Sequence, residues 1–406
     1  MISFPDVKSL LQPDRCTLSD GGTLLLFPTE STELVKLDLI FDAGYSQQSQ
    51  KLCARAVSKL MTVATRCMDS RRLAEYLDYR GVLTDSSLGL CKNILSVYTH
   101  RRYLDEVLAV VDDMIHQPAF NESDFEVWRA AKRQEMLAAF KRSSAQARRI
   151  WYHALFGPDH PLGQYATVED LDRIELNSVA DFHSGHYNNC QVIASGNVND
   201  IIFTFVSKEA SKTQYAVCQP KATAIQQPVV FSIDGAQQTS FRIGRILPEN
   251  DGRLLILTSL LGGYFGSRLM INLREDKGFT YGISAHMQEY GDGTTVFYIL
   301  SDVAAGTAQV AVDEVMSELR RLGEEPVSQD ELDVVRNVLA GDAMRALDGV
   351  FERAERLCDI IENGHSWLMD PDFGKILHEV TPDQLCDLAR RYLNPEDMTV
   401  ALAGVI

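Results

Sequence analysis

An internal repeat is the sequence feature that most limits what this chain can fold into. Two successive stretches show the same order of segments: two strands, helices, two more strands, further helices and a final apolar strand. Three pairs of landmark residues are separated by nearly equal distances along the chain, of 207, 205 and 208 residues: Phe125 and Leu332, Tyr187 and Tyr392, and Gly196 and Gly404. Such agreement across different elements is hard to obtain by chance, so we expect two homologous domains that arose by duplication.

The length supports this division, because 406 residues are too many for one compact core. We predict an N-terminal α+β repeat at residues 1–213 and a C-terminal α+β repeat at 229–406. The segment 214–228 is rich in Gln, Ala and Pro and is predicted to be an extended linker. Within the repeats, Asn121 is typical of a helix N-cap, and the run Ser328–Glu331 has the form of a capping box.

The composition is that of a soluble globular protein, with 45% hydrophobic and 23% charged residues. A net charge of −17 argues against nucleic acid and anionic membranes as partners. An acidic inner wall could prefer basic peptides, although net charge alone does not locate the charge. The N-terminal residues do not form a secretory signal, and no apolar run is long enough to cross a bilayer. We therefore expect a cytoplasmic protein.

Eight cysteines are scattered along the chain without a Cys-x-x-Cys pair. In a chain of this length, that distribution predicts buried, reduced thiols in a cytosolic protein rather than a disulfide framework. It also argues against a metal site built on the cysteines.

The segment with the clearest chemical content is Leu273–Gly282, with the sequence LREDKGFTYG. An arginine is expected to end a helix, a Lys-Gly turn to reverse the chain, and a tyrosine to open the next strand. This layout can direct the guanidinium of Arg274 and the phenol of Tyr281 at one carbonyl oxygen. The alternative is structural: Arg274 would pair with Glu275 or Asp276 at the helix end, and Tyr281 would pack in the sheet.

A Gly-rich turn precedes this segment and contains Gly262, Gly263, Tyr264 and Phe265. We predict that these residues form a flexible loop that contacts substrate. Alternatively, the glycines only permit positive φ angles and close backbone approach. A phosphate-binding loop is excluded, because no Gly-Lys-Ser/Thr follows.

Together with HPLG at 160–163 and the helix-to-strand step at Tyr187–Val198, the run GGYFGSRLMINLREDKGFTYGISA resembles the insulinase/pitrilysin family of zinc peptidases. The resemblance covers most of the chain and is strongest over Leu260–Ala285. It implies an α+β fold of two homologous domains, each a mostly antiparallel sheet covered by helices, which enclose a peptide chamber. It also implies that Arg274 and Tyr281 contact substrate carbonyl groups.

Active members of that family carry His-x-x-Glu-His on the first long helix, and a further glutamate about 75 residues later completes the zinc ligands. In this chain the helix reads LCARAVSKLM over 52–61, and no histidine precedes His100. Alignment on Met61 places Ala56, Lys59 and Leu60 at the motif positions. Glu135 lies near the third ligand position, but a lone carboxylate does not hold zinc, and a helix-surface glutamate is the simpler interpretation.

Other candidate residues carry weaker signals. His183 and His186 are three residues apart and could share a helix face, but no acidic residue is placed as a third ligand. We interpret both as structural histidines. The basic pairs Lys141-Arg142 and Arg148-Arg149 are most simply a solvated helix face.

The resemblance therefore implies a zinc-less subunit of a heterodimeric peptidase that acts on peptides and is inactive alone. We expect no cofactor in this chain, and zinc in a homologous partner subunit. The alternative function is a catalytically inactive scaffold subunit of the same family. A third hypothesis is a homodimeric enzyme with an improvised metal site at His183 and His186.

Overall fold

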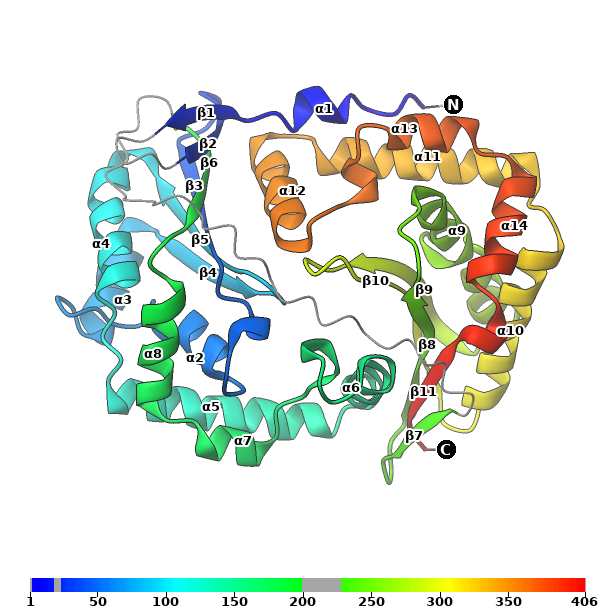
Figure 1. Cartoon of the computed structure of the whole chain (residues 1–406), viewed down its shortest axis with the longest axis horizontal. Coiled ribbons are helices and arrows are strands. Elements are labelled where there is room, and N and C mark those ends of the chain that lie inside the picture. Colours follow the sequence, from blue (N-terminus) through cyan, green and yellow to red (C-terminus); the bar gives the residue numbers. More distant parts are fainter. Residues whose placement is uncertain (1, 18–22, 199–227, 406) are drawn as a thin grey trace.

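The computed structural model describes residues 2–17, 23–198 and 228–405 of the chain and contains two β-sheets (Figure 1). The first sheet has the strand order β1-β2-β6-β3-β5-β4, and only its β2–β6 pair is parallel. Its strands are β1 Asp14–Thr17, β2 Thr23–Pro28, β3 Leu34–Phe41, β4 Leu83–Leu88, β5 Asn93–His100 and β6 Gln191–Gly196.

The second sheet has the order β7-β11-β8-β10-β9, and only its β7–β11 pair is parallel. Its strands are β7 Val229–Ser232, β8 Gln238–Leu247, β9 Thr280–Glu289, β10 Thr295–Ala304 and β11 Thr399–Gly404. With β1 set aside, both sheets follow one scheme, in which the last strand of the repeat lies between the first and second strands. This shared topology is what a duplication predicts.

The landmark residues occupy equivalent places in the two halves. Phe125 and Leu332 are each the fourth residue of a long helix, and both are fully buried. Gly196 and Gly404 end the last strands with φ angles of +100° and +142°, which favour glycine. The segment 214–227 of the predicted linker lies outside the described residues, so the domain boundary stays a prediction.

Helices surround both sheets (Figure 1). In the first half they are α1 Val7–Leu10, α2 Cys53–Leu60, α3 Ser70–Arg80, α4 Leu104–His116, α5 Glu122–Phe140, α6 Ser143–Phe156, α7 Val168–Arg173 and α8 Leu176–His186. In the second half they are α9 Gly252–Gly262, α10 Ala308–Glu324, α11 Gln329–Ala346, α12 Val350–Asn363, α13 Phe373–Glu379 and α14 Pro382–Tyr392. As predicted, the Asn121 side chain caps α5 by accepting from the Asp124 amide.

One helix of each half packs against the sheet of the other half. Helix α6 from the first half packs against β8 and β11. Its Trp151 side chain is fully buried, and the indole Nε1–H donates to the Thr399 carbonyl oxygen at 3.0 Å. Conversely, α12 packs on β2, β3 and β6 of the first sheet, with Ala354 and Cys358 buried there (Figure 1). This exchange makes the two halves one packed unit, and the apolar periodicity of single helices did not predict it.

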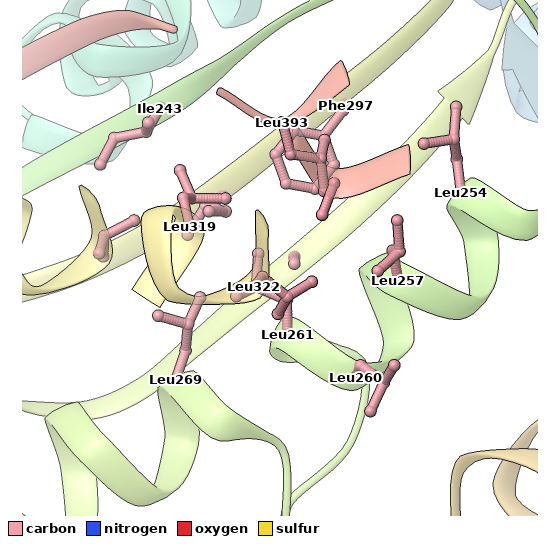
Figure 2. Packing of buried hydrophobic residues seen from close by; sticks show 14 of the residues in the cluster. Ile243, Leu254, Leu257, Leu260, Leu261, Leu269, Phe297, Leu319, Leu322 and Leu393 are labelled. Carbon is pink, nitrogen blue, oxygen red and sulfur yellow. The ribbon is translucent and has the colours of Figure 1, made fainter. Parts of the chain in front are cut away.

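The second-half core lies between its sheet and helices α9 and α10 (Figure 2). Leucines of α9, among them Leu257, Leu260 and Leu261, meet Leu319 and Leu322 of α10. Because all five side chains are almost fully removed from water, this packing holds α9 and the segment that follows it in place.

The helix expected over 52–61 is α2, which spans Cys53–Leu60. Leu52 adopts a left-handed conformation with φ +75°, so the helix cannot begin earlier. Of the seven cysteines described, five are buried as predicted, and Cys16 and Cys67 are exposed. Across the described ranges, no helix combines the length and apolarity needed to span a bilayer.

Glu362 in the last turn of α12 provides a pH-dependent test of the contact between the halves. It covers Gly89 so closely that a Cβ built there would lie 1.6 Å from its Oε1. Burial, together with the charge of Asp359, raises the pKa of Glu362 to about 7. The folded state therefore holds this proton where the unfolded state has released it. Wild-type stability is consequently lost as the pH rises from about 4.5 to about 7.

We expect Glu362→Gln to raise the melting temperature at pH 8 and to leave it unchanged at pH 4, where the carboxyl is protonated in both states. Thermal unfolding followed by circular dichroism at both pH values measures this, with Glu379→Gln on the exposed end of α13 as the matched control. An equal gain at both pH values would show that the effect does not come from the proton.

Candidate functional site

The Gly-rich turn begins at the C-terminus of α9, where the helix packs closely on β9. A Cβ at Gly262 would lie 2.6 Å from the Ala285 backbone nitrogen, and one at Gly263 would lie 2.6 Å from the Ser259 Cα. Gly263 has φ −88°, so positive φ is not the reason for glycine here. The alternative interpretation of these glycines is therefore confirmed in one respect, because they permit close backbone approach. It is wrong in the other, because Gly263 does not have a positive φ angle.

A seven-residue π-helix (η4, Met270–Asp276) carries Arg274 in its last turn. The chain then reverses at Gly278, whose φ of +65° suits glycine, and Tyr281 is the second residue of β9. The predicted order of helix, Lys-Gly turn and strand is thus present. Leu273 is fully buried and anchors the π-helix to the core.

The structural alternative for Arg274 and Tyr281, an ion pair at the helix end and packing in the sheet, is wrong. The Arg274 guanidinium lies over the ring of Phe265, 4.3 Å from its centroid, and makes no ion pair with the described carboxylates. Tyr281 does not pack in the sheet, because its side chain is 92% exposed. Phe265 is also exposed, at 62%. The donors of both side chains are consequently accessible to a ligand, and their roles in catalysis stay a prediction.

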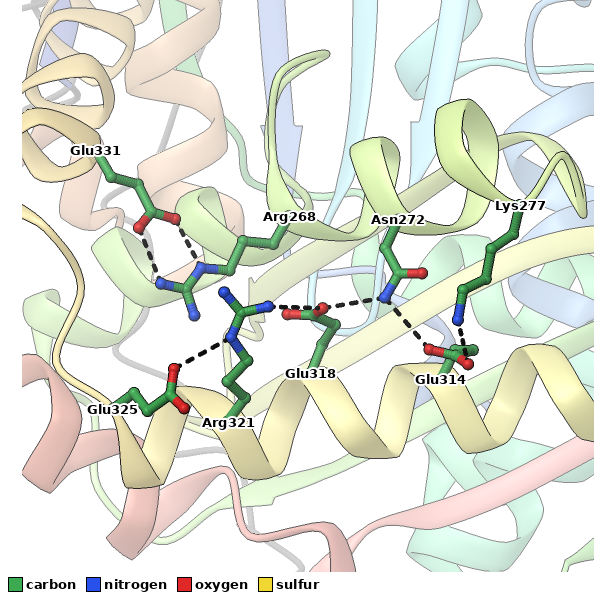
Figure 3. Close-up of polar contacts among 8 residues, drawn as sticks. All are labelled: Arg268, Asn272, Lys277, Glu314, Glu318, Arg321, Glu325 and Glu331. Carbon is green, nitrogen blue, oxygen red and sulfur yellow. Dashed lines mark hydrogen bonds and ion pairs between the residues drawn. The ribbon is translucent and has the colours of Figure 1, made fainter.

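A set of ion pairs and hydrogen bonds holds this segment against α10 and α11 (Figure 3). Arg268 donates from Nε and Nη2 to the two carboxylate oxygens of Glu331, at 2.7 and 2.9 Å. Asn272 donates to Glu318 at 3.0 Å, and Lys277 pairs with Glu314. These contacts are made before, within and after the π-helix, so they fix the backbone that carries Arg274.

The Arg268–Glu331 pair also explains a departure from the predicted capping box. Ser328 caps α11 as expected, since its Oγ accepts from the Glu331 amide at 3.2 Å. The Glu331 carboxylate, however, turns to Arg268 instead of returning to the Ser328 backbone. A guanidinium that donates two charge-assisted hydrogen bonds is a stronger partner for the carboxylate than a single backbone N–H.

A double-mutant cycle with Arg268→Met and Glu331→Gln should give a coupling energy of about 1–3 kcal/mol in the free energy of unfolding. The side chains are only 13% and 25% exposed, so water screens the pair weakly. Urea unfolding of the four variants measures the coupling. The Arg71–Glu75 pair on α3 is the control, because exposures of 88% and 65% predict at most about 0.5 kcal/mol. If both pairs gave the same coupling energy, the Arg268–Glu331 pair would not be what holds the π-helix segment against α11.

The helix that resembles the zinc-motif helix is α2, and the register that places Ala56 and Leu60 at histidine positions is wrong. Both side chains are buried in the first-half core. Arg55 and Lys59, one turn apart, instead border a pocket of about 370 Å³. Glu135 of α5 borders the same pocket. The signal for this register was in the sequence, because Glu135 follows Lys59 by 76 residues, close to the expected spacing.

This pocket does not suit zinc. Besides Arg55, Lys59 and Glu135, it is bordered by Lys132, whose Nζ lies 2.8 Å from the Glu135 carboxylate. Three cations and one carboxylate, itself already paired, repel a divalent cation and offer it no imidazole. Within the described part of the chain, no group of three or more His, Cys, Asp or Glu side chains is arranged to hold a metal ion.

The candidate histidines His183 and His186 have structural partners. His183 donates from Nε2 to the Ile115 carbonyl oxygen at 2.9 Å, and burial lowers its pKa to about 4. The Nδ1 of His186 donates to the Asp42 carbonyl oxygen at 3.1 Å. Since each imidazole is already hydrogen-bonded to a different carbonyl, these contacts bear out the structural interpretation and give no support to an improvised metal site.

The HPLG motif joins the two halves. His160 accepts from the Leu162 amide at Nδ1, and its Nε2 lies 3.4 Å from the carboxylate of Asp292 in the β9–β10 turn. Although burial alone would raise it, the pKa of Asp292 is lowered by hydrogen bonds from His160 and Thr294. The motif is therefore a structural contact rather than a candidate catalytic site.

Comparison with known proteins agrees with this architecture. A family model described as the peptidase M16 inactive domain matches residues 173–339. The uncharacterized zinc protease YmxG of Bacillus subtilis (strain 168) is 22% identical over 412 residues, covering 96% of this chain and 97% of the relative.

Solved structures share the fold. A protease from Helicobacter pylori superposes with a TM-score of 0.84 at 16% identity, covering 96% of this chain and 99% of that chain. The peptidase M16 inactive domain from Pseudomonas fluorescens gives 0.78 at 18% identity, covering 97% and 98%. The periplasmic protease PqqL from Escherichia coli gives 0.74 at 15% identity, and the match covers 99% of this chain but 48% of that longer chain.

This chain therefore shares the duplicated two-domain fold of peptidase M16 structures, and its residues 173–339 match the peptidase M16 inactive domain. It is similar along its length to a protein named as a zinc protease, and its own sequence lacks His-x-x-Glu-His.

Proposed function

We propose that this chain is the zinc-less subunit of a heterodimeric insulinase-like metallopeptidase. A homologous partner subunit holds the zinc, which supplies an activated water, and both subunits work in the cytoplasm on peptide substrates. The observation that carries the proposal is a contrast within this chain. Tyr281 is exposed and Arg274 is half-buried against Phe265, while the α2 residues Arg55 and Lys59 place cations at the pocket beside Glu135.

The roles of this chain's own residues follow from their donors. The Tyr281 hydroxyl and the Arg274 N–H groups donate to the carbonyl oxygen of the scissile peptide bond. These hydrogen bonds strengthen as that oxygen becomes an oxyanion. Phe265 holds the guanidinium by a cation–π contact while leaving its N–H groups free to donate.

Substrate positioning involves a sheet edge. Strand β9, which begins just before Tyr281, is the edge strand of the second sheet. Its unpaired main-chain groups can take an extended peptide as an added strand. The neighbouring residues Gly262, Gly263, Tyr264 and Phe265 would then contact the bound peptide.

Reconstitution tests this division of labour. The chain is purified alone and together with a homologue that retains His-x-x-Glu-His, and cleavage of an internally quenched peptide library is measured with and without a zinc chelator. We expect only background cleavage from this chain alone, and chelator-sensitive cleavage from the pair. Zinc-dependent cleavage by this chain alone would refute the proposal.

The second candidate function is a scaffold subunit that takes no part in hydrolysis. The Arg268–Glu331 pair and the packing of α6 and α12 on the opposite halves make the protein rigid. A scaffold subunit also needs such rigidity. A scaffold, however, has no use for accessible Arg274 and Tyr281 donors, and variants of these two residues separate the two functions.

A further inference from the structure

A second, larger pocket lies beside α2 and has an unusual charge. It measures about 490 Å³ and is formed by α2, α5, α6 and the η3 turn at Pro161–Gly163. Five cationic side chains border it, and none of its described lining residues is an Asp or Glu. The cations are Lys51, Arg55, Lys132, Arg148 and Arg149. We call this site the basic pocket.

Only two of the five cations are neutralised. Lys51 pairs with Asp170 at 3.3 Å, and Lys132 pairs with Glu135 at 2.8 Å. Across the described residues, the three arginines have no carboxylate partner. Three guanidinium groups that share one concave site repel one another, and an anion in the pocket relieves that repulsion.

Arg148 is exposed, as expected for a solvated helix face, whereas Arg149 departs from that expectation because it is half-buried. Its guanidinium lies 4.1 Å from the ring centroid of Tyr165, and its Nε is buried without a hydrogen-bond acceptor. Lys141 is exposed, as predicted. An orphaned buried donor at the wall of a cationic pocket is a position where a ligand oxygen can bind.

The positive field extends beyond the pocket. Burial lowers the pKa of Arg242 on β8, and the nearby charge of Arg148 contributes to the lowering. This concentration of positive charge occurs in a chain whose net charge is −17. The acidic net charge therefore does not describe this site, where the fold gathers five cationic side chains.

The pocket is built for a peptide rather than for a small inorganic anion. Tyr45, Tyr152 and Tyr165 line it together with leucines, so its walls offer apolar surface beside the charges. Leu88, the last residue of β4, also borders it, and β4 is the edge strand of the first sheet. A peptide added along β4 would pass this pocket and could direct an acidic side chain into it.

We propose that the basic pocket binds the carboxylates of acidic peptide segments, with Arg55, Arg148 and Arg149 as the carboxylate-binding residues. This activity goes beyond the proposed hydrolytic function. It belongs to this chain alone and needs neither a partner subunit nor turnover.

Isothermal titration calorimetry on the purified chain tests the proposal with three capped tetrapeptides. The first is acetyl-Ala-Glu-Glu-Ala-amide, the second has Gln in place of both Glu residues, and the third is the Gln peptide with a free C-terminal carboxylate. We expect the Glu peptide to bind at least about tenfold more tightly than the amidated Gln peptide, and to weaken as salt is raised. The third peptide shows whether a terminal carboxylate can replace the side chains.

Arg55→Gln and Arg148→Gln should each weaken Glu-peptide binding about tenfold, because each removes one charge-assisted donor. Lys141→Gln on the neighbouring exposed surface removes the same charge and should leave binding unchanged. Circular dichroism verifies that all three variants are folded. Equal affinity for the Glu and amidated Gln peptides, binding of inorganic phosphate alone, or equal effects of all three substitutions would each overturn the proposal. Because no cleavage is measured, such a failure leaves the proposed peptidase function untouched.

Discussion

Replacing Tyr281 with phenylalanine should lower the kcat of the reconstituted pair by about two orders of magnitude, and Arg274→Met should have an effect of similar size. The ring of Tyr281 is 92% exposed, so loss of its hydroxyl removes a donor without disturbing the core. Each donor is expected to act on charge that develops only in the transition state. KM should therefore change much less than kcat, and steady-state kinetics on one quenched peptide separates the two parameters.

Exposed residues of the same types provide matched controls for these variants. Tyr79 is 80% exposed and the Arg71 side chain is 88% exposed, both on α3, and Tyr79→Phe and Arg71→Met should leave kcat unchanged. The Arg274→Met, Tyr281→Phe double variant should still form the complex by size-exclusion chromatography. If it forms the complex and cleaves peptide at the wild-type rate, the scaffold function is correct and the donor role is wrong.

Trp151→Ala should lower the free energy of unfolding by about 3–5 kcal/mol, the largest effect on stability that we expect from one substitution. The indole belongs to α6 of the first half but is fully buried against the second sheet, where it donates to the Thr399 carbonyl oxygen. Its removal creates a cavity between the halves and also deletes a hydrogen bond that spans them. Urea unfolding monitored by circular dichroism measures the change.

Trp151→Phe serves as the graded variant, because it keeps most of the apolar volume and loses the N–H donor. It should cost clearly less than Trp151→Ala. Trp128→Ala on α5 is the second control, since Trp128 is only partly buried and lies outside the contact between the halves. A loss of less than about 1 kcal/mol for Trp151→Ala would show that α6 contributes little to joining the halves.

The repeat in the sequence predicted much of the fold correctly. Apolar residues that recur every second position indicate strands, and those that recur every third or fourth indicate helices. The nearly equal separations of Phe125/Leu332 and Gly196/Gly404 indicate a duplicated order of these elements. The two sheets then follow one strand order. The exchange of α6 and α12 could not be predicted in this way, because an apolar helix face does not specify which sheet it will cover.

For the candidate site too, the sequence predicted some features correctly and missed others. Local spacing was sufficient to predict a helix that ends near Arg274, the Lys-Gly turn and the strand that opens near Tyr281, although the helix is a π-helix and continues to Asp276. The register of the motif helix was missed because it was aligned on Met61, although the 76 residues between Lys59 and Glu135 indicated that Arg55 and Lys59 face the pocket.

The sequence by itself determined the duplicated α+β architecture, the absence of His-x-x-Glu-His and the order of Arg274 and Tyr281 along the chain. Only the tertiary structure decided that Arg274 rests on Phe265 rather than on a neighbouring carboxylate, and that Arg55, Arg148 and Arg149 meet at one pocket. The physical reason is that charge and burial at a site are sums over residues distant in the chain. Net charge and local periodicity carry no information about which distant residues the fold brings together.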